Sequence, residues 1–389
     1  MPTAIKISNY KSVFDLELEL GDVSIFIGEN GCGKSNILEA IAITSAAANN
    51  KLDNEFLFSR GIRVTSPEFM LSAFDKTDKE KKIKIHFKNT PIEIAYNEQT
   101  KKWDNFLWIK ISDSIVESIV ENFDPELVNF LNKANPNNKE IKILGDMVRA
   151  KVEDKIIKTR EDLSKTLIIF DFLIYSPEYS FLRNFETEGQ IQPFGIRGEG
   201  VFKYIKNLIQ EKNIDKLNEI KEHLQVFDWF DDIVTDNGKT FTGDYTLKLK
   251  DRYIDSEFDY FDHKSTNEGF LFVLFYICVM VHENTPEFFA IENIEASLNP
   301  KLCTELVKLL VKMSSKYNKK IILTTHNPAV LDGIDLKDDN QRLFRIYRNK
   351  SGHTKALRIA DKSDIPEGSQ VKLSEAFMRG YLGGLPTSF

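Results

Sequence analysis

The chain has 389 residues, of which 42% are hydrophobic and 29% are charged, and these proportions are those of an ordinary globular protein. Its formal net charge of −7 gives no general attraction to nucleic acid, although a local basic groove is compatible with that charge. The three cysteines, Cys32, Cys278 and Cys303, form no CxxC or Cys/His cluster, so we expect neither a disulfide framework nor a zinc site.

Segments that would direct the chain to a membrane are not expected. The first residues show no basic region followed by an apolar one, which is the pattern of a signal peptide. The apolar run at residues 269–281 is too short to cross a bilayer and predicts a buried helix. We therefore expect a cytoplasmic chain with no membrane partner.

The N-terminal region predicts mostly strands. Residues 4–7 and 14–20 alternate apolar and polar side chains, which indicates two half-buried strands. Another strand is expected near residues 67–71. Three alternating segments separated by polar turns then predict an antiparallel meander, at residues 83–87, 92–96 and 106–111.

The stretch from Gly28 to Ser35, GENGCGKS, fits the G-x-x-x-x-G-K-[ST] pattern of a phosphate-binding P-loop. A strand-like run precedes it and helix-forming residues follow it, which places backbone N–H groups and a helix N-terminus around a polyphosphate. Lys34 would reach the β- and γ-phosphates of ATP, and the Ser35 hydroxyl would bind Mg²⁺. The other expected cofactor-binding residues of the loop are Asn30, Gly31, Cys32 and Gly33.

Later parts of the chain alternate between helical and strand patterns. Residues 112–165 are polar and helical in pattern and predict an inserted helical segment. Residues 166–170 are apolar and indicate a return to the main sheet. Further elements are expected as helices at 201–225 and 302–315, strands at 245–253, 288–291 and 320–325, and a hairpin from 344–347 and 355–359.

A P-loop needs an acidic partner at the end of a neighbouring strand to hold Mg²⁺. One segment has this form, because the apolar strand at residues 288–291 ends at Glu292. The whole segment from Phe288 to Pro300, FFAIENIEASLNP, resembles the Walker B and D-loop region of ABC-type ATPases of the RecF, SMC and overcoming-lysogenization-defect (OLD) group.

Three further segments agree with that group in order and spacing. NYKS at 9–12 resembles its opening strand turn, STNEG at 265–269 its signature motif, and TTHNP at 324–328 its switch-histidine motif. In these regions the chain is similar to the small AAA-family (ABC-type) ATPases of bacterial anti-phage systems.

The resemblance implies an α/β fold: a P-loop NTPase of ABC-ATPase type, with a mixed central sheet, an antiparallel meander and an inserted helical segment. It also implies four parts: the N-terminal part of the ATPase head (1–111), the helical insertion (112–165), a return to the head with a helical subdomain (166–260), and the C-terminal part of the head (261–389).

The resemblance also assigns roles outside the P-loop. Ser265 and Gly269 would contact the γ-phosphate bound by the opposite subunit, although Ser265 could also be a helix N-cap. His326 would contact the γ-phosphate of its own subunit, and Glu292 would bind Mg²⁺.

The chain departs from the family pattern at one catalytic position. Asn293 stands where the catalytic glutamate is usual, and an amide orients water but does not accept its proton. The loss of such a base costs on the order of 10²–10⁴-fold in rate. Glu295 could take over the catalytic role or be structural. We therefore expect tight, Mg²⁺-dependent ATP binding with slow hydrolysis.

The partners follow from the resemblance. It implies a head-to-tail homodimer with ATP sandwiched at the interface, or a higher homo-oligomer, that acts as a switch on a separately encoded effector such as a nuclease or toxin. One alternative is a RecF-like DNA-repair ATPase that binds nucleic acid. Another is a scaffold that binds ATP without hydrolysing it.

Overall fold

The computed structural model describes most of the chain outside the predicted helical insertion. Of the residues 112–165, it describes only 114, 153–159 and 162, so that prediction lies almost wholly outside the described part. No helix among the described residues is long and apolar enough to span a membrane. The described residues are 3–74, 82–88, 90–107, 111, 114, 153–159, 162, 168–183, 193–235, 246–255, 260–360 and 371–383.

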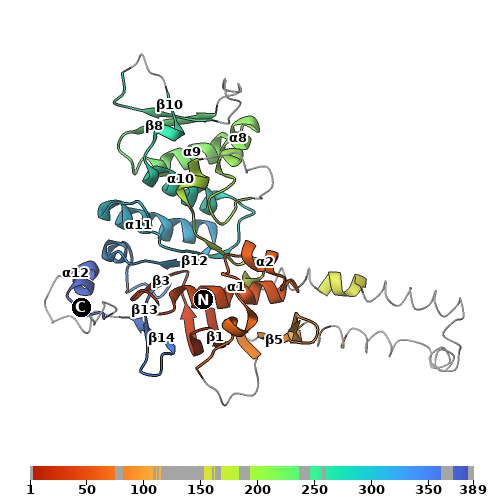
Figure 1. Ribbon diagram of the computed structural model, residues 1–389. Coiled ribbons are helices and arrows are strands. Elements are labelled where there is room, and N and C mark those ends of the chain that lie inside the picture. Colours follow the sequence, from red (N-terminus) through yellow and green to blue (C-terminus); the bar gives the residue numbers. More distant parts are fainter. Residues whose placement is uncertain are drawn as a thin grey trace, which may run out of the picture.

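A six-stranded sheet lies at the centre of the molecule (Figure 1). Its strand order is β14-β13-β3-β12-β11-β7; only β14 is antiparallel to its neighbour. Because the other strands are parallel, their carboxyl ends meet at one edge, where ligands bind in open α/β sheets. The bounds are β3 (Val23–Ile27), β7 (Leu173–Tyr175), β11 (Phe288–Ile291), β12 (Lys320–Thr324), β13 (Gln341–Arg348) and β14 (Thr354–Ile359).

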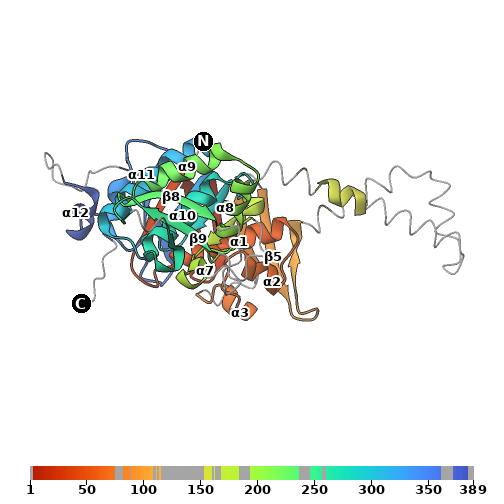
Figure 2. The same cartoon turned by 90° about the horizontal axis from the view of Figure 1, so that it is seen from above.

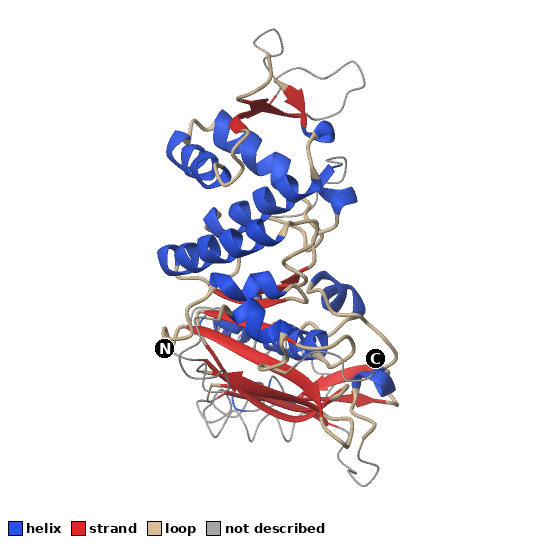
Figure 3. Ribbon diagram, turned by 90° about the vertical axis from the view of Figure 1, so that its left-hand side faces the viewer, coloured by secondary structure: helices blue, strands red, loops and turns tan. Residues whose placement is uncertain are grey.

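The central strands are buried on both faces, because two hydrophobic cores lie on opposite sides of the sheet. In β3, Val23, Ile25 and Ile27 belong to one core and Phe26 to the other. Helices α10 (Glu268–Val281) and α11 (Pro300–Tyr317) cover the first face, and α1 (Lys34–Ala48) covers the second (Figures 1 and 3). Every residue of α10 after Glu268 is buried, which confirms the buried helix expected from the apolar run.

A five-stranded antiparallel sheet packs against α1 on the second face (Figure 3). The meander is confirmed, but its third strand begins and ends earlier than the predicted residues 106–111. The chain reverses early because the Asn97 side chain accepts the N–H groups of Gln99 and Thr100 and closes a tight turn. The strands, in the order β2-β1-β4-β5-β6, are β1 (Thr3–Tyr10), β2 (Val13–Leu20), β4 (Lys82–Phe87), β5 (Thr90–Asn97) and β6 (Lys102–Asn105).

The predicted strand near residues 67–71 is wrong, because this segment forms the short helix α3 (Pro67–Met70). Pro67 stands at its first helical position, where the missing N–H costs nothing. Within the predicted strand, Leu71 alone pairs with another strand, through an isolated antiparallel β-bridge to Tyr10. The other short helices outside the helical layers are α2 (Asn54–Ser59), η3 (Pro328–Gly333) and α12 (Leu373–Met378).

A helical layer and a small sheet lie beyond α10 (Figure 1), and they overlap α10 when the molecule is seen from above (Figure 2). The helix expected over 201–225 is two helices, and Lys212, with φ 53°, lies in the break between them. The return to the main sheet comes later than residues 166–170, because a 3₁₀ turn precedes β7. This turn is η1 (Ile168–Asp171), which packs against α1 on the second face. The elements beyond α10 are α7 (Tyr179–Arg183), α8 (Val201–Gln210), α9 (Ile214–Leu224), β8 (Phe230–Thr235), β9 (Leu247–Asp251), β10 (Phe261–Asp262) and η2 (His263–Ser265).

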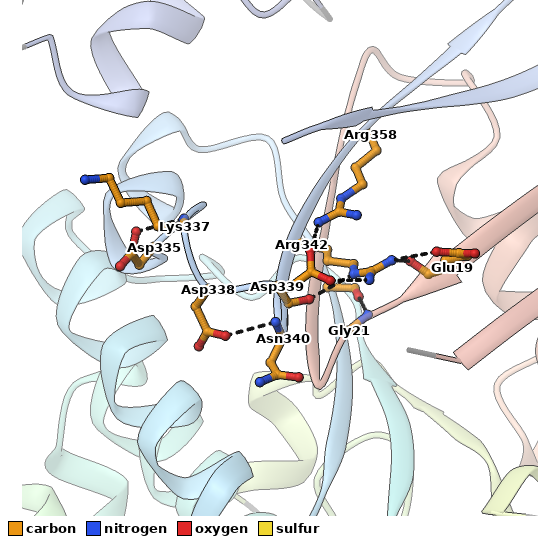
Figure 4. A network of polar contacts seen from close by, with 10 residues as sticks. Glu19, Gly21, Asp335, Lys337, Asp338, Asp339, Asn340, Arg342 and Arg358 are labelled. Carbon is orange, nitrogen blue, oxygen red and sulfur yellow. Dashed lines mark hydrogen bonds and ion pairs between the residues drawn. The ribbon is translucent and has the colours of Figure 1, made fainter. Parts of the chain in front are cut away.

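At the amino ends of the parallel strands, Arg342 joins the two sheets (Figure 4). Its guanidinium donates to the backbone carbonyl of Glu19 at 2.7 Å and to that of Asp339 at 3.0 Å. Asp339 also pairs with Arg358. The Arg342 side chain is buried, whereas Glu19 and Asp339 are exposed. The network lies at the opposite end of β3 from the P-loop, so it supports the fold without entering the site described next.

Candidate functional site

The P-loop connects β3 to α1 at the carboxyl edge of the central sheet, as the motif predicts. Glycine is required at several of its positions. A Cβ at Gly28 would lie 2.2 Å from the carbonyl oxygen of Ile346, and one at Gly33 would lie 2.1 Å from Oγ1 of Thr354. Gly31 and Gly33 also have positive φ angles of 74° and 109°, which glycine adopts without steric cost. The loop is therefore a tight backbone cradle.

The N-terminus of α1 fits an anion. Its N-cap is Gly33, which has no side chain to satisfy the N–H groups of the first turn. Lys34 is buried, and its Nζ donates to the carbonyl oxygens of Gly28 at 2.8 Å and Glu29 at 3.1 Å. Burial lowers the pKa of the Lys34 ammonium, and the charges of Glu295 and Glu292 oppose that effect. A cation, open N–H groups and a glycine cradle together suit a phosphate chain.

The acidic segment follows β11 and lies beside this cradle. Glu292 is half-buried and donates its backbone N–H to the Tyr175 carbonyl at 2.9 Å, which fixes it at the strand end. The neighbouring Asn293 is exposed, and its N–H donates to Oγ1 of Thr324 at 3.0 Å. These contacts bring Glu292 and Asn293 to the same edge as Lys34, as expected from the sequence.

Glu295 joins this segment to the loop after β12. Its Oε1 accepts the backbone N–H of His326 at 2.8 Å. Its Oε2 is buried and has no hydrogen-bond partner among the described residues. A buried carboxylate oxygen without a donor is costly, and such groups concentrate at functional sites. Glu295 therefore holds the His326 loop with Oε1, while Oε2 has no hydrogen bond to a described residue to give up before it takes part in chemistry.

His326 is exposed at the end of β12. Partial desolvation lowers the pKa of its ring, the Lys34 charge lowers the pKa further, and Glu295 opposes both. At neutral pH the imidazole is therefore uncharged and presents one donor and one acceptor. The electrostatic effects of Lys34 and Glu295 also place His326 at the same edge of the sheet.

The signature segment lies at the start of α10, next to the residues that follow Glu295. Ser265 is exposed, but it is not the N-cap: Asn267 caps α10 by accepting the Phe270 N–H at 2.8 Å. Gly269 is buried, and a Cβ there would lie 2.9 Å from the carbonyl oxygen of Ser297. A cavity of about 380 Å³ opens between the N-termini of α10 and α11. The helix that begins at this segment and the P-loop helix belong to cores on opposite faces of the central sheet.

The donor set near the P-loop suits Mg²⁺. The described residues contain no group of three or more His, Cys, Asp or Glu side chains arranged to hold a metal ion. Mg²⁺ commonly takes one or two protein oxygens and completes its shell with phosphates and water. The Ser35 hydroxyl and the Glu292 carboxylate could supply those protein oxygens.

The sequence analysis missed the side chains that support the P-loop from behind. Thr354 in β14 donates from Oγ1 to the Cys32 carbonyl at 2.8 Å and contacts Oγ of Ser12 at 2.8 Å. Arg348 donates to the Gly31 carbonyl at 3.1 Å. These partners lie more than 300 residues from the P-loop along the chain, and no local pattern could have indicated them.

Comparison with known families agrees with this geometry. Residues 1–231 of the 389 match a family model described as "AAA ATPase domain". The chain belongs to this AAA ATPase domain family. Residues 268–332, which include α10, the acidic segment and His326, match a second model, "AAA domain, putative AbiEii toxin, Type IV TA system".

The chain is also similar to individual proteins. Over 100 residues it is 27% identical to the DNA replication and repair protein RecF of Listeria monocytogenes, in serotype 4b and in serovar 1/2a, and the match covers 25% of this chain. The chain spans 24% of the length of those relatives. A solved structure of the SMC head bound to the C-winged helix domain of ScpA superposes with a TM-score of 0.52 at 13% identity, covering 92% of this chain and 98% of that one. The last similarity confirms the predicted fold class.

Asn293 has a backbone reason to be an asparagine in this AAA ATPase domain. Its φ of 50° lies in the left-handed region, which Asn tolerates better than any other residue except glycine. The turn places the 293 side chain at the surface beside Glu292, and a glutamate there would be strained. The sequence showed the departure from the family pattern but not this conformational cause.

Proposed function

We propose that the chain binds Mg²⁺–ATP at the P-loop, hydrolyses it slowly, and switches between nucleotide-dependent assemblies. The observation that carries this proposal is the meeting of Lys34, Glu292, Glu295 and His326 at one sheet edge. The His326–Glu295 hydrogen bond joins two of them. Burial lowers the pKa of Lys34 and the charges of Glu295 and Glu292 oppose that effect, while desolvation and then the Lys34 charge lower the pKa of His326. P-loop ATPases use this combination of a cation, a carboxylate and a water-positioning group.

Each residue has a role in the proposal. Asn30, Gly31, Cys32 and Gly33 surround the phosphates, Lys34 neutralises their charge, and Ser35 and Glu292 hold Mg²⁺, which neutralises developing charge when bound. Lys34 must leave the carbonyls of Gly28 and Glu29 to reach a phosphate. That exchange replaces hydrogen bonds between the ammonium and neutral carbonyls by hydrogen bonds between two charged groups.

Water activation is divided between an amide and a carboxylate. Asn293 orients the attacking water, and Glu295 accepts its proton once its Oε2, which is buried in this structure, turns towards that water. His326 contacts the γ-phosphate from the loop that Glu295 holds. Because Glu295 is already engaged through Oε1, it is a less free base than a glutamate at position 293, and turnover is slow.

Assembly supplies the remaining contacts. Gly269 lies at the start of α10, which belongs to the core on the opposite face of the central sheet from the P-loop helix, and we propose that Ser265 and Gly269 complete the site of a second copy in a head-to-tail dimer. ATP shared across that interface stabilises the closed state, and hydrolysis releases it. A higher homo-oligomer built from such dimers is compatible with the same contacts.

The output of the switch is exerted on a separately encoded effector, a nuclease or toxin, in anti-phage defence. The family description for residues 268–332 includes the words "putative AbiEii toxin, Type IV TA system", which supports a role in a system made of more than one protein. Finding nuclease activity in the purified chain alone would contradict a separate effector.

The test measures ATP turnover and oligomer mass on the wild type, Lys34→Ala and Glu295→Gln, with Mg²⁺ and ATP. We expect Lys34→Ala to lose ATP binding and assembly, and Glu295→Gln to bind and assemble without turnover. A wild type that neither binds ATP nor assembles would overturn the proposal. A wild type that assembles but never turns over would instead favour an ATP-dependent scaffold.

A second candidate function is a RecF-like ATPase that acts on DNA, which the similarity to RecF favours. It requires a basic surface on the assembled protein despite the net charge of −7. Binding of DNA that weakens steeply with salt, and only in the ATP-bound assembly, would support it.

A further inference from the structure

A buried carboxylate lies on the P-loop helix, one turn beyond the residues assigned to nucleotide binding. Glu39 in α1 is 1% exposed and lies five positions after Lys34. Glutamate is almost never buried without charged partners, because its desolvation is expensive. Nothing in the proposed ATP chemistry uses Glu39, so its burial requires another explanation.

Four donors from two separate segments converge on Glu39. Its Oε2 accepts the Lys11 ammonium at 2.5 Å and the Tyr10 hydroxyl at 3.3 Å. Its Oε1 accepts from Arg63 twice, from Nε at 2.5 Å and from the backbone N–H at 3.3 Å. Both oxygens are therefore satisfied, and the two cations Lys11 and Arg63 leave the cluster with a net charge of one positive unit.

The network continues from Glu39 to the phosphate-binding backbone. Nη2 of Arg63 donates to Oδ1 of Asn36 at 3.1 Å, and Nδ2 of Asn36 donates to Oγ of Ser12 at 2.6 Å. Ser12 contacts Thr354, which donates to the Cys32 carbonyl inside the P-loop. Asn36 directly follows Ser35, so Arg63 is held against the first turn of α1.

Arg63 contacts both Glu39 and Asn36, the residue that follows the candidate Mg²⁺ ligand Ser35. Its side chain remains 64% exposed, whereas that of Lys11 is 12% exposed. Burial lowers the pKa of the Arg63 guanidinium, but the hydrogen bond to Glu39 and the charges of Glu39 and Glu292 outweigh it and raise the pKa. The cation that Glu39 holds is thus within electrostatic reach of the candidate Mg²⁺ ligand.

We propose that Glu39 is a positioning residue, which fixes Lys11 and Arg63 around the first turn of the P-loop helix and thereby sets the affinity for ATP. This inference rests on the proposed ATP binding. Glu39 does not touch the nucleotide; it acts through Arg63 and Asn36 on the loop that does.

The test is a double-mutant cycle on equilibrium binding of a fluorescent ATP analogue. We expect Glu39→Gln and Arg63→Met each to weaken binding about tenfold, the usual value of one lost charge-assisted contact, and the double variant to be weaker by about the same factor rather than about 100-fold. A merely structural role for Glu39 would lower thermal stability without this non-additivity.

Glu219→Gln is the matched control. Glu219 in α9 is a half-buried carboxylate that bonds to Lys316 and Tyr317 at the end of α11, far along the chain from the P-loop. Glu219→Gln should change the melting temperature but not the affinity for the ATP analogue. Combined with Arg63→Met, it should leave the affinity at the value of Arg63→Met alone.

The outcomes separate the two proposals. A wild type that binds no ATP analogue overturns the proposed function itself. A wild type that binds, with Glu39→Gln unchanged or with effects that multiply, overturns only the role of Glu39. If Glu39→Gln fails to fold, the inference is tested with Lys11→Met and Arg63→Met, because both variants leave Glu39 in place. Unchanged affinity for the ATP analogue in both variants refutes the inference.

Discussion

Asn293→Glu restores a carboxylate at the position where related ATPases carry their catalytic base. If the missing base limits turnover, the variant should hydrolyse ATP on the order of 10²–10⁴-fold faster, because general-base catalysis contributes that factor. The backbone at position 293, with φ 50°, opposes the change. A residue other than Gly, Asn or Asp costs about 1–2 kcal/mol there, so the melting temperature should fall while the rate rises.

The assay is steady-state phosphate release at saturating Mg²⁺–ATP, with thermal unfolding measured on the same samples. Asn293→Gln is the control, because it brings the longer side chain and the same strain but no base. It should be as unstable as Asn293→Glu and no faster than wild type. Equal rates for wild type and Asn293→Glu, with ATP affinity retained, would refute the reasoning and leave Glu295 as the working base.

Three further predictions concern the scaffold. Arg342→Met should lower the free energy of unfolding by about 2–4 kcal/mol in a urea titration, because it leaves two carbonyls without donors, and should leave ATP affinity unchanged. Gly33→Ala should abolish ATP binding, since its Cβ would lie 2.1 Å from Thr354, whereas Gly31→Ala, which meets no atom within 4 Å, should only weaken it. Burial, reinforced by Lys319, lowers the pKa of His282 to about 4, so the unfolded chain takes up this proton first. Stability should therefore fall as pH drops from about 6.5 towards 4, and less so in His282→Phe, when melting temperatures are compared across that range.

The parts of the fold that depend on neighbouring residues could be predicted from the sequence. The strand, loop and helix around Lys34 follow from a short motif and its flanks, and the strand that ends just before Glu292 follows from its apolar run. Where two local signals competed, prediction failed. The apolar residues near Phe69 favoured a strand, but Pro67 begins a helix. Both Ser265 and Asn267 are good N-caps, and only the structure shows that Asn267 is used.

The network around Glu39 could not have been predicted in this way. Glu39 lies 28 residues from Lys11 and 24 from Arg63, and on α1 it looks like an ordinary solvated residue of a helical face. Its burial follows from the packing of the antiparallel sheet on α1, which no helical period encodes. Likewise, the conformation that suits Asn293 depends on the Thr324 hydroxyl from a different strand.

The pairing of β3 has a consequence for synthesis of the protein. This strand carries the P-loop near the start of the chain, yet its two neighbours are β12 and β13, which begin at Lys320 and Gln341. A ribosome must therefore deliver some three hundred residues before the strand has any partner. Until then its apolar side chains need shelter, and contacts so distant in sequence form slowly. Newly made chains should therefore depend on chaperones, and ATP binding should report completed folding.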